Sequence, residues 1–492
     1  MMQNRRWEWV LNAPAWCVYR FDLDRCSRWN TDEIAKYTGD LAFEVRGLGL
    51  RDGQRFLIGP DGFPDLRVNA FLGSPRMRNL AETTNRDYAH SLALWLNYLL
   101  SRGCRWQDAT GDDAGEFEFW RLTDPANAAT VSPSTLAKDI AACKKFYTWA
   151  AGRYREVTDV FADVDFPRAK REASVKWLDP AAVTRWRDVG LRGRDLTRRR
   201  DRSWRGRNEQ RDSAFVDGLY GTGLRLTEWA SLVLPELPRP EADRSFYTCA
   251  LADRCAKGGY GHPYWMPRRV LSAVRAYCEG ARARVVREAQ NASRYDAVAG
   301  ALIVERARKR GSVSMPDGDG GFVERSWNLV GPALRRRMFR ATAAGLEPVA
   351  LWLNENGVPR DPHGWHHTFE AANSRIAALG LDSFTCTPHM LRHSFALRWF
   401  SVGMLVYSSR LAHLDEDQAR DFRTQFGDTW HLVQTMLGHR HVETTKNVYL
   451  EPFRALSVQV LFAHAEGFPV AEFMAQAFAS HPMVASDPVV SP

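Results

Sequence analysis

The 492-residue chain is poor in lysine: it contains nine lysines, so the other 58 of its 67 basic residues are arginines. A coding bias toward GC-rich codons would account for this imbalance in bulk. Arginine nevertheless suits phosphate, because its planar fork can bind two oxygens at once. The net charge of +9 is compatible with a polyanionic partner but does not prove one. Because lysines are so scarce, the position of each one is informative.

Metal-binding cysteine patterns are also missing. The eight cysteines are dispersed along the chain, none forms a C-x-x-C pair, and no His/Cys cluster has zinc spacing. We therefore expect no metal, and reduced thiols are favoured over disulfides.

Long apolar runs are absent as well. No uncharged apolar stretch reaches membrane-spanning length, and Arg5, Arg6 and Glu8 interrupt any candidate signal peptide. These absences predict a soluble, cytoplasmic protein. Apolar residues still make up 45% of the chain, which is enough for real cores, and the length predicts two to four domains.

Shifts in composition divide the chain into four segments, and we see no internal repeats. The first has short strand-like runs and no role that we can name, the second is helical, the third is large and interrupted by insertions, and the last has helical periodicity and a loose tail. The predicted bounds are 1–78, 79–168, 169–455 with insertions around 190–212 and 281–385, and 456–492.

The second segment predicts three helices. Apolar residues recur at intervals of three and four over Tyr88, Leu92, Trp95, Leu96 and Leu99. A second helix is expected from Asp112 or Asp113 to Leu122, and a third from Ser132-Pro133, where serine caps the first turn.

Three of the nine lysines, Lys138, Lys144 and Lys145, fall on this third helix. They indicate either a DNA-facing surface or an ordinary solvated face, and the sequence leaves both open. Nine arginines between 192 and 211 pose the same choice. Such a run is usually a solvated loop, but Arg198, Arg199 and Arg200 could instead neutralise phosphates and release counterions.

Arg225 lies in the run GLRLTE (223–228), between a predicted helix at 213–220 and a second helix from 224 onward. Glu228 follows it by three residues and can hold the guanidinium from the same helix face. Taken alone, such a pair is far more often a surface ion pair. The G-x-G at 221–223 lacks the third glycine of a nucleotide-binding loop, so we reject that function.

Other reactive side chains follow. Lys257 sits in a Lys-Gly-Gly turn between strand-like runs at 246–252 and 264–266, which predicts a hairpin. His389 and Arg392 are three residues apart on a helix that Thr387 caps. His439 follows a predicted helix end at 437–438, and Tyr449 comes ten residues later. A free tyrosine has a pKa of about 10, so its attack at neutral pH needs a base and cationic surroundings.

Each of these features is weak by itself, but the ordered set resembles the tyrosine recombinase family, also called the phage integrases. The motifs cover about 175–455, while 80–165 is similar to the family's SAM-like core-binding domain more in helical pattern than in motif. The resemblance implies a mainly α fold with a small β-hairpin or sheet (α+β), in which a helical core-binding domain precedes the catalytic domain.

The resemblance also implies a mechanism. Tyr449 would attack the scissile phosphate and leave a 3′-phosphotyrosyl link, while Arg225 and Arg392 clamp the non-bridging oxygens. Because the covalent bond conserves the energy, neither ATP nor metal is required.

The remaining roles move protons. His389 would act as general base, His439 would hydrogen-bond the phosphate, and Lys257 would protonate the leaving 5′-oxygen. The gap between Lys257 and His389 is longer than the family usually needs, which leaves the exact domain bounds open.

The predicted function is a site-specific DNA recombinase that works as a homotetramer on double-stranded DNA and associates with the nucleoid. Accessory DNA-bending proteins are candidate partners. The extra N-terminal module and the insertions favour mobile-element integration over chromosome-dimer resolution. Two alternatives use the same scaffold: a silent DNA-binding protein, and a type IB topoisomerase. The predicted helix near 455–478, which could dock in a neighbouring subunit, favours the recombinase.

Overall fold

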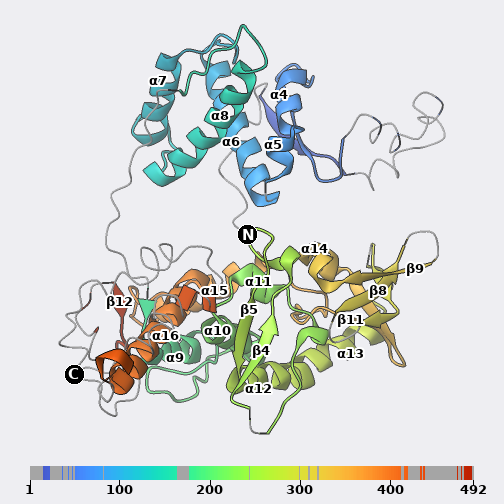
Figure 1. Cartoon of the computed structure of the whole chain (residues 1–492), viewed down its shortest axis with the longest axis vertical. Helices are drawn as coiled ribbons and strands as arrows, with labels where there is room; N and C mark the ends of the chain where they lie inside the picture. The colour runs from blue at the N-terminus through green and yellow to red at the C-terminus, as the bar shows by residue number, and fades with distance from the viewer. Residues whose placement is uncertain are drawn as a thin grey trace. The chain divides into compact units, whose positions relative to one another are not determined.

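A computed structural model describes residues 15–22, 36, 43, 47, 50–80, 82–162, 177–242, 244–298, 300–307, 311–317, 321–411, 415–418, 433–434, 436–437, 474, 478, 481 and 483–489. The predicted linker at 166–168, His439, Tyr449 and nearly all of the predicted helical segment near 455–478 lie outside these residues. The chain divides into two compact units, Met1–Glu172 and Ala173–Pro492 (Figure 1). Within the described residues, no helix is both long and apolar enough to cross a membrane.

The N-terminal unit combines a small hairpin with helices. Strands β1 and β2 pair antiparallel, and Asp65, Thr110 and Ser132 cap α4, α7 and α8 through their side chains. The three helices predicted between 82 and 151 are confirmed as α6 to α8. The elements are β1 (Cys17–Arg20), β2 (Arg55–Ile58), α4 (Leu66–Leu72), α5 (Pro75–Arg78), α6 (Glu82–Ser101), α7 (Gly111–Leu122) and α8 (Pro133–Ala151).

One hydrophobic core runs through the described part of this unit. Trp95 on α6 is fully buried, and its indole N–H donates to the Tyr147 hydroxyl on α8. Leu57 on β2 and Phe71 on α4 belong to the same core. Residues before and after the predicted boundary at 78 therefore pack together, and the boundary itself stays a prediction.

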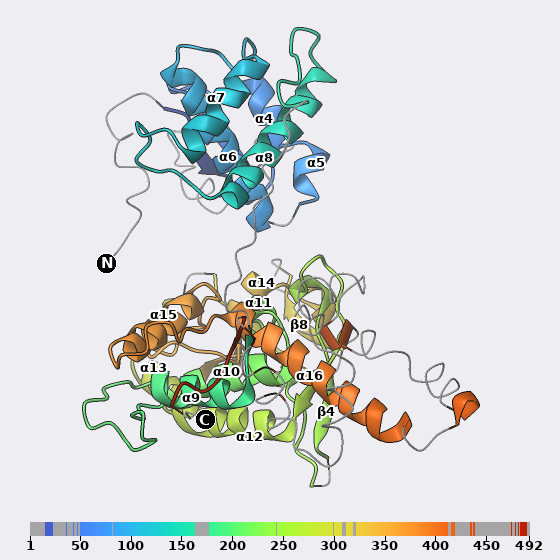
Figure 2. The ribbon, with the colours of Figure 1, turned by 90° about the vertical axis from the view of Figure 1, so that its left-hand side faces the viewer.

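The C-terminal unit is built around α10, which packs against α12 and α16 (Figure 2). Most of α10 is buried, and small residues let neighbours approach it: a Cβ at Gly218 would lie 2.0 Å from the Trp229 ring. Its main helices are α9 (Pro180–Gly190), α10 (Glu209–Thr222), α11 (Leu226–Ala230), α12 (Arg268–Tyr277), α13 (Ala283–Asn291), α14 (Pro332–Arg336), α15 (Gly364–Ala377) and α16 (Pro388–Leu411).

Its strands form small sheets, so the fold is mainly α with minor β, as predicted. The predicted hairpin is confirmed as the antiparallel pair β4 and β5. Two sheets lie within the expected insertion, in the orders β11-β10-β6 and β7-β8-β9. The strands are β3 (Trp177–Leu178), β4 (Phe246–Ala250), β5 (Pro263–Pro267), β6 (Leu302–Val304), β7 (Arg306–Ala307), β8 (Ser312–Pro316), β9 (Phe322–Ser326), β10 (Met338–Thr342), β11 (Gly345–Pro348) and β12 (Val484–Ala485).

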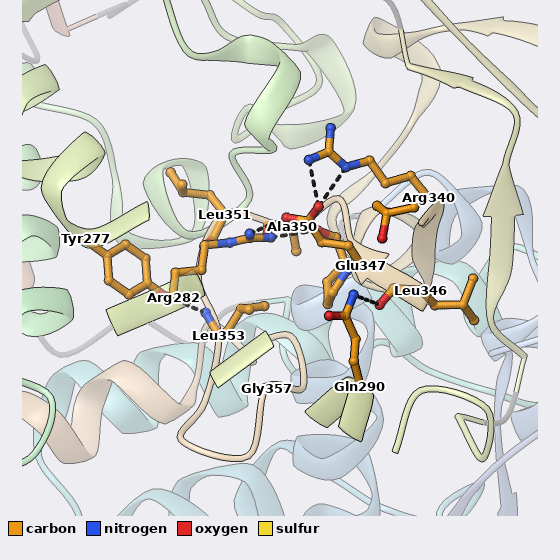
Figure 3. A network of polar contacts seen from close by, with 12 residues as sticks. Tyr277, Arg282, Gln290, Arg340, Leu346, Glu347, Ala350, Leu351, Leu353 and Gly357 are labelled. Atoms are coloured by element: carbon orange, nitrogen blue, oxygen red, sulfur yellow. Dashed lines mark hydrogen bonds and ion pairs between the residues drawn. The ribbon is translucent and has the colours of Figure 1, made fainter. Parts of the chain in front are cut away.

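Arg282 ties this insertion to the rest of the unit (Figure 3). It ends a π-helical turn, Cys278–Arg282, between α12 and α13. Its Nε donates to the Leu351 carbonyl, Nη1 to Glu347 at 2.7 Å, and Nη2 to the carbonyls of Pro348 and Ala350. All three guanidinium nitrogens are thus bonded, and the side chain is buried. The network fixes β11 and the strand-like run after it against the helices.

Candidate active site

Arg225 is placed by the turn that joins α10 to α11. Helix α10 ends at Thr222, and Gly223 adopts a left-handed conformation with φ of 68°. The Arg225 backbone N–H then donates to Glu228 at 2.8 Å, and its Nη1 donates to the other oxygen of the same carboxylate at 3.0 Å. The predicted pair exists, but the Glu228 side chain is fully buried, which distinguishes it from a surface ion pair.

Glu228 also links the hairpin to this turn. One of its oxygens accepts the backbone N–H of Lys257 at 3.2 Å, which holds the β4–β5 connection beside Arg225. Burial acts to raise the pKa of Glu228, but the charges of Arg225 and Arg392 outweigh it and the net shift is downward. The carboxylate is therefore ionised at neutral pH.

The Lys257 side chain itself is exposed. Gly258 and Gly259, which follow it, have φ of 89° and 78°, a conformation that glycine adopts at little cost. This turn holds the lysine at the surface of the unit.

His389 and Arg392 come from the first turns of α16. The Thr387 hydroxyl accepts the Met390 N–H at 3.3 Å, so the predicted cap is present. Arg392 is buried, and it donates from Nη1 to the Gly223 carbonyl and from Nη2 to the Leu437 carbonyl at 2.7 Å. Arg392 thereby ties α16 to the turn that presents Arg225, and to the residue that precedes Gly438 and His439 in the chain.

The ring of His389 reaches solvent, yet its pKa is lowered. Partial burial is the largest cause, followed by the charges of Arg392, Arg225 and Lys257. These interactions bring all four residues, which are scattered over more than 130 positions of the sequence, into one electrostatic cluster. The lowered pKa keeps His389 neutral, and so able to accept a proton, at pH 7.

Sequence reasoning missed His393. It is buried, and its ring lies 4.3 Å from that of His389 at an angle of 84°, centroid to centroid. On its other side it meets Trp177 edge-on at 5.6 Å. The spacing of four from His389 on a predicted helix was a signal that the two rings share a face. His393 packs against His389 and limits the positions that the His389 ring can take.

The predicted site thus divides into placed and unplaced parts. Arg225, Glu228, Lys257, His389 and Arg392 come together, whereas His439 and Tyr449 lie outside the described residues. In the described part of the chain, no three His, Cys, Asp or Glu side chains gather in a way that could hold a metal ion.

The predicted DNA-binding lysines on α8 differ from one another. Lys138 is exposed, whereas Lys144 donates to the Ala162 carbonyl at 3.1 Å and the Lys145 ammonium lies 5.8 Å from the centre of the Tyr88 ring. Their role in binding DNA stays a prediction.

Comparisons with known proteins agree with the motifs. Residues 75–153 match the family model of the phage integrase N-terminal SAM-like domain. Tyrosine recombinase XerC of Roseiflexus sp. strain RS-1 is 24% identical over 383 residues, which cover 78% of this chain and 87% of that protein. Tyrosine recombinase XerC of Roseiflexus castenholzii is 30% identical over 156 residues, which cover 32% of this chain and 44% of that protein.

Among solved structures, the Tn1549 transposon integrase in complex with circular intermediate DNA has a TM-score of 0.43 and 16% identity, with 81% of this chain and 98% of that chain covered. The motifs and the sequence relatives together assign this chain to the tyrosine recombinase family, and its enzyme class is that of the site-specific DNA recombinases.

Proposed function

We propose that the chain cleaves and rejoins double-stranded DNA through a 3′-phosphotyrosyl intermediate at Tyr449. The observation that carries this proposal is the gathering of three cations, Arg225, Lys257 and Arg392, around the neutral His389, with Glu228 as the carboxylate that holds Arg225. This excess of positive charge suits a phosphodiester, whose negative charge grows on the non-bridging oxygens as the nucleophile attacks.

In the proposed reaction, these side chains account for every proton that is transferred. The Tyr449 hydroxyl attacks phosphorus and loses its proton to His389, while the bond from phosphorus to the 5′-oxygen breaks. Lys257 gives a proton to the departing 5′-oxygen. The reverse reaction, with the 5′-hydroxyl of another strand as nucleophile, reseals the DNA. His439 hydrogen-bonds a non-bridging oxygen in both directions.

The two arginines have different parts in this proposal. The Arg225 side chain is 27% exposed, and its ion pair with the buried Glu228 orients it. Its remaining N–H groups can therefore reach a bound phosphate. Arg392 is buried and supports the site from inside, where its charge acts with less screening by water.

Covalent trapping tests the proposal. The full chain is incubated with a pool of nicked random-sequence duplexes, and SDS-resistant protein–DNA adducts are isolated and sequenced. We expect an adduct for the native chain and none for Tyr449→Phe. An adduct that persists in Tyr449→Phe contradicts the assigned nucleophile, and no adduct with any DNA favours the silent DNA-binding alternative.

Lys257 has a test of its own. Lys257→Ala should lose cleavage on ordinary DNA but recover it when the bridging 5′-oxygen is replaced by sulfur, because a thiolate leaves without a proton. No recovery with the sulfur substrate would remove Lys257 from the general-acid role.

The biological setting belongs to the same proposal. We infer a homotetramer on two duplexes, in the cytoplasm and at the nucleoid, with residues 79–168 as the core-binding domain and accessory DNA-bending proteins as partners. Mobile-element integration is favoured over dimer resolution because the insertion between β5 and α16 adds two sheets to the catalytic unit. Efficient relaxation of supercoils by a monomer would instead favour the topoisomerase alternative.

A further inference from the structure

The segment 192–208, which we call the arginine loop, is folded by its own backbone. It connects α9 to α10. The Asp195 N–H donates to the Arg199 carbonyl at 2.8 Å, and the Asp201 N–H donates to the Gly193 carbonyl at 2.9 Å. Arg194 and Arg200 form an antiparallel bridge, and Arg198 turns the chain with φ of 66°. The arginines therefore project from a defined turn.

Trp204 anchors this turn to the unit. Its ring fills the space over two glycines, since a Cβ at Gly193 or Gly206 would lie 2.2 or 2.1 Å from it. The Arg375 guanidinium of α15 lies 4.8 Å from the ring centre of Trp204 and donates to Asp201 at 2.7 Å. The loop is thus fixed to α15 at its base.

The acidic residues of the loop serve its own fold. Asp195 accepts hydrogen bonds from the Thr197 hydroxyl and from the backbone N–H groups of Thr197 and Arg199. The pKa of Asp201 is lowered to about 2, first by the Ser203 hydroxyl and then by Arg375. Both carboxylates are occupied in shaping the turn.

The charge of the loop is consequently unbalanced. Its 17 residues contain eight arginines and two aspartates, a net charge of 8 − 2 = +6. Within the described residues, four ion pairs join the loop to acids outside it, and none is shorter than 3.5 Å: Arg192 to Asp188 at 3.5 Å, Arg192 to Asp217 at 3.9 Å, Arg198 to Asp487 at 3.9 Å and Arg207 to Glu355 at 4.0 Å. Seven of the arginines are exposed: Arg194, Arg198, Arg199, Arg200, Arg202, Arg205 and Arg207.

This surface lies away from the candidate active site. The loop enters α10 at Glu209, whereas Arg225 follows the other end of that helix. Fourteen residues at about 1.5 Å each separate the two ends by roughly 20 Å. The loop lies below α9 in Figure 1 and extends to the left of α9 in Figure 2, while α11 lies at the upper edge of the unit in both views. A phosphate bound at Arg225 is therefore out of reach of the side chains of the loop, which lies at the opposite end of α10.

The surface next to the loop is hollowed. Two adjoining cavities, of about 530 and 550 Å³, share Arg207, Ala281 and Arg284 in their walls. No large apolar side chain is exposed on the loop itself. A protein partner would normally bury an apolar centre, whereas phosphate contacts need only donors and charge.

We propose that the arginine loop is a second DNA-binding surface, which takes a duplex other than the one whose phosphate enters the active site. The inference rests on the proposed function for its biological sense, since a recombinase must hold two duplexes or distant parts of one. The chemical argument depends on the loop alone. Its turn presents forked guanidinium donors that can bind phosphate, and the two aspartates of the loop are engaged in other hydrogen bonds.

A bridging assay tests it. Beads carrying a 40-base-pair random-sequence duplex are mixed with the full chain and a labelled second duplex, and the captured label is measured against salt. The variant Arg199→Ala/Arg200→Ala/Arg202→Ala removes three exposed guanidinium groups from the loop. The control Arg239→Ala/Arg287→Ala/Arg325→Ala removes three exposed arginines elsewhere in the unit.

We expect the loop variant to lower capture at least about tenfold relative to the control, and to reduce the salt slope by about 2.7, or about 0.9 for each phosphate contact. Lysine at the same three positions should restore most of the capture, because charge is kept; this also excludes a folding defect. Equal capture by the loop and control variants would overturn the inference.

The covalent-adduct assay, run on the same proteins, separates the two proposals. A loop variant that loses bridging far more than adduct yield supports a separate surface. Parallel loss of both would place the loop on the cleaved duplex and overturn the inference. If no protein forms an adduct, the proposed function fails, while the bridging result still decides the role of the loop.

Discussion

Arg282 and Arg225 lie in the same unit but are held in opposite ways. Arg282 is buried, and all three of its guanidinium nitrogens are bonded to Glu347 or to backbone carbonyls. Arg225 is partly exposed, and within the described residues its side chain has one partner, Glu228, through Nη1. The hydrogen bonds of Arg282 hold parts of the protein together and leave none of its guanidinium nitrogens unbonded. Arg225 keeps guanidinium N–H groups that can bind a ligand.

The carboxylates show the same difference. Glu347 lies between Arg282 and Arg340, and it completes a network inside the insertion. Glu228 accepts from Arg225 and from the Lys257 amide, and it joins the segments that carry the proposed chemistry. The number of arginines in a region does not distinguish a structural network from a candidate binding site. The number of hydrogen-bonded donors on each arginine does.

The largest effect on stability should come from Arg282→Ala. It would leave Glu347 without its buried partner and several carbonyls without a donor, which costs about 3–5 kcal/mol in the free energy of unfolding. Arg340→Ala removes the 52% exposed partner of the same carboxylate and should cost under about 1 kcal/mol. Denaturant unfolding of both variants measures these losses of free energy. Equal losses would contradict the difference between the buried and the exposed arginine.

Arg225→Lys should show the reverse pattern. The lysine keeps a positive charge beside Glu228, so we expect the free energy of unfolding to change by under about 1 kcal/mol. The fork that binds two phosphate oxygens is lost, and strand cleavage should fall about 100-fold. Single-turnover cleavage together with unfolding measures both quantities, and near-native cleavage would remove Arg225 from the phosphate clamp.

Substitutions at two glycines test how closely α16 packs on the turn whose carbonyl accepts from Arg392. Alanine at Gly223 or at Gly258 must adopt a positive φ, which costs about 1–2 kcal/mol at either position. At Gly223 the new Cβ would also lie 2.4 Å from the Phe395 ring, which adds about 1–3 kcal/mol, whereas Gly258 has open space. Thermal unfolding should rank Gly223→Ala as the more harmful change; the opposite order would contradict the packing of α16 on this turn.

The smallest effect concerns pH. Since burial and three cations lower the pKa of His389, its neutral form should persist below pH 6.5. Cleavage should therefore be flat near neutrality and fall only at a pH below the ordinary value for histidine, as the ring gains a proton. His389→Gln should cleave slowly and lose this acid limb, and an unchanged limb would assign it to another group.

The sequence predicted the local elements well because their signals are local. Caps at Ser132 and Thr387 and the β4–β5 hairpin follow from short patterns of residues. The order of Arg225, Lys257, His389 and Arg392 indicated the family.

Other features depend on contacts distant in sequence, which periodicity does not reveal. The grip of Arg392 on the Gly223 carbonyl is one, and the packing of Trp204 on the arginine loop is another. The same holds for His393, whose burial beside His389 depends on Trp177, more than 200 residues away. In the sequence, nothing distinguishes Arg282 from the other arginines, because its four oxygen partners come together only in the folded chain.

The most direct measurement is mass spectrometry of the peptide that remains linked to DNA after nuclease and protease digestion of the trapped adduct. We expect a nucleotide joined through its 3′-phosphate to Tyr449. A linkage to any other residue, or through a 5′-phosphate, would contradict the proposed function.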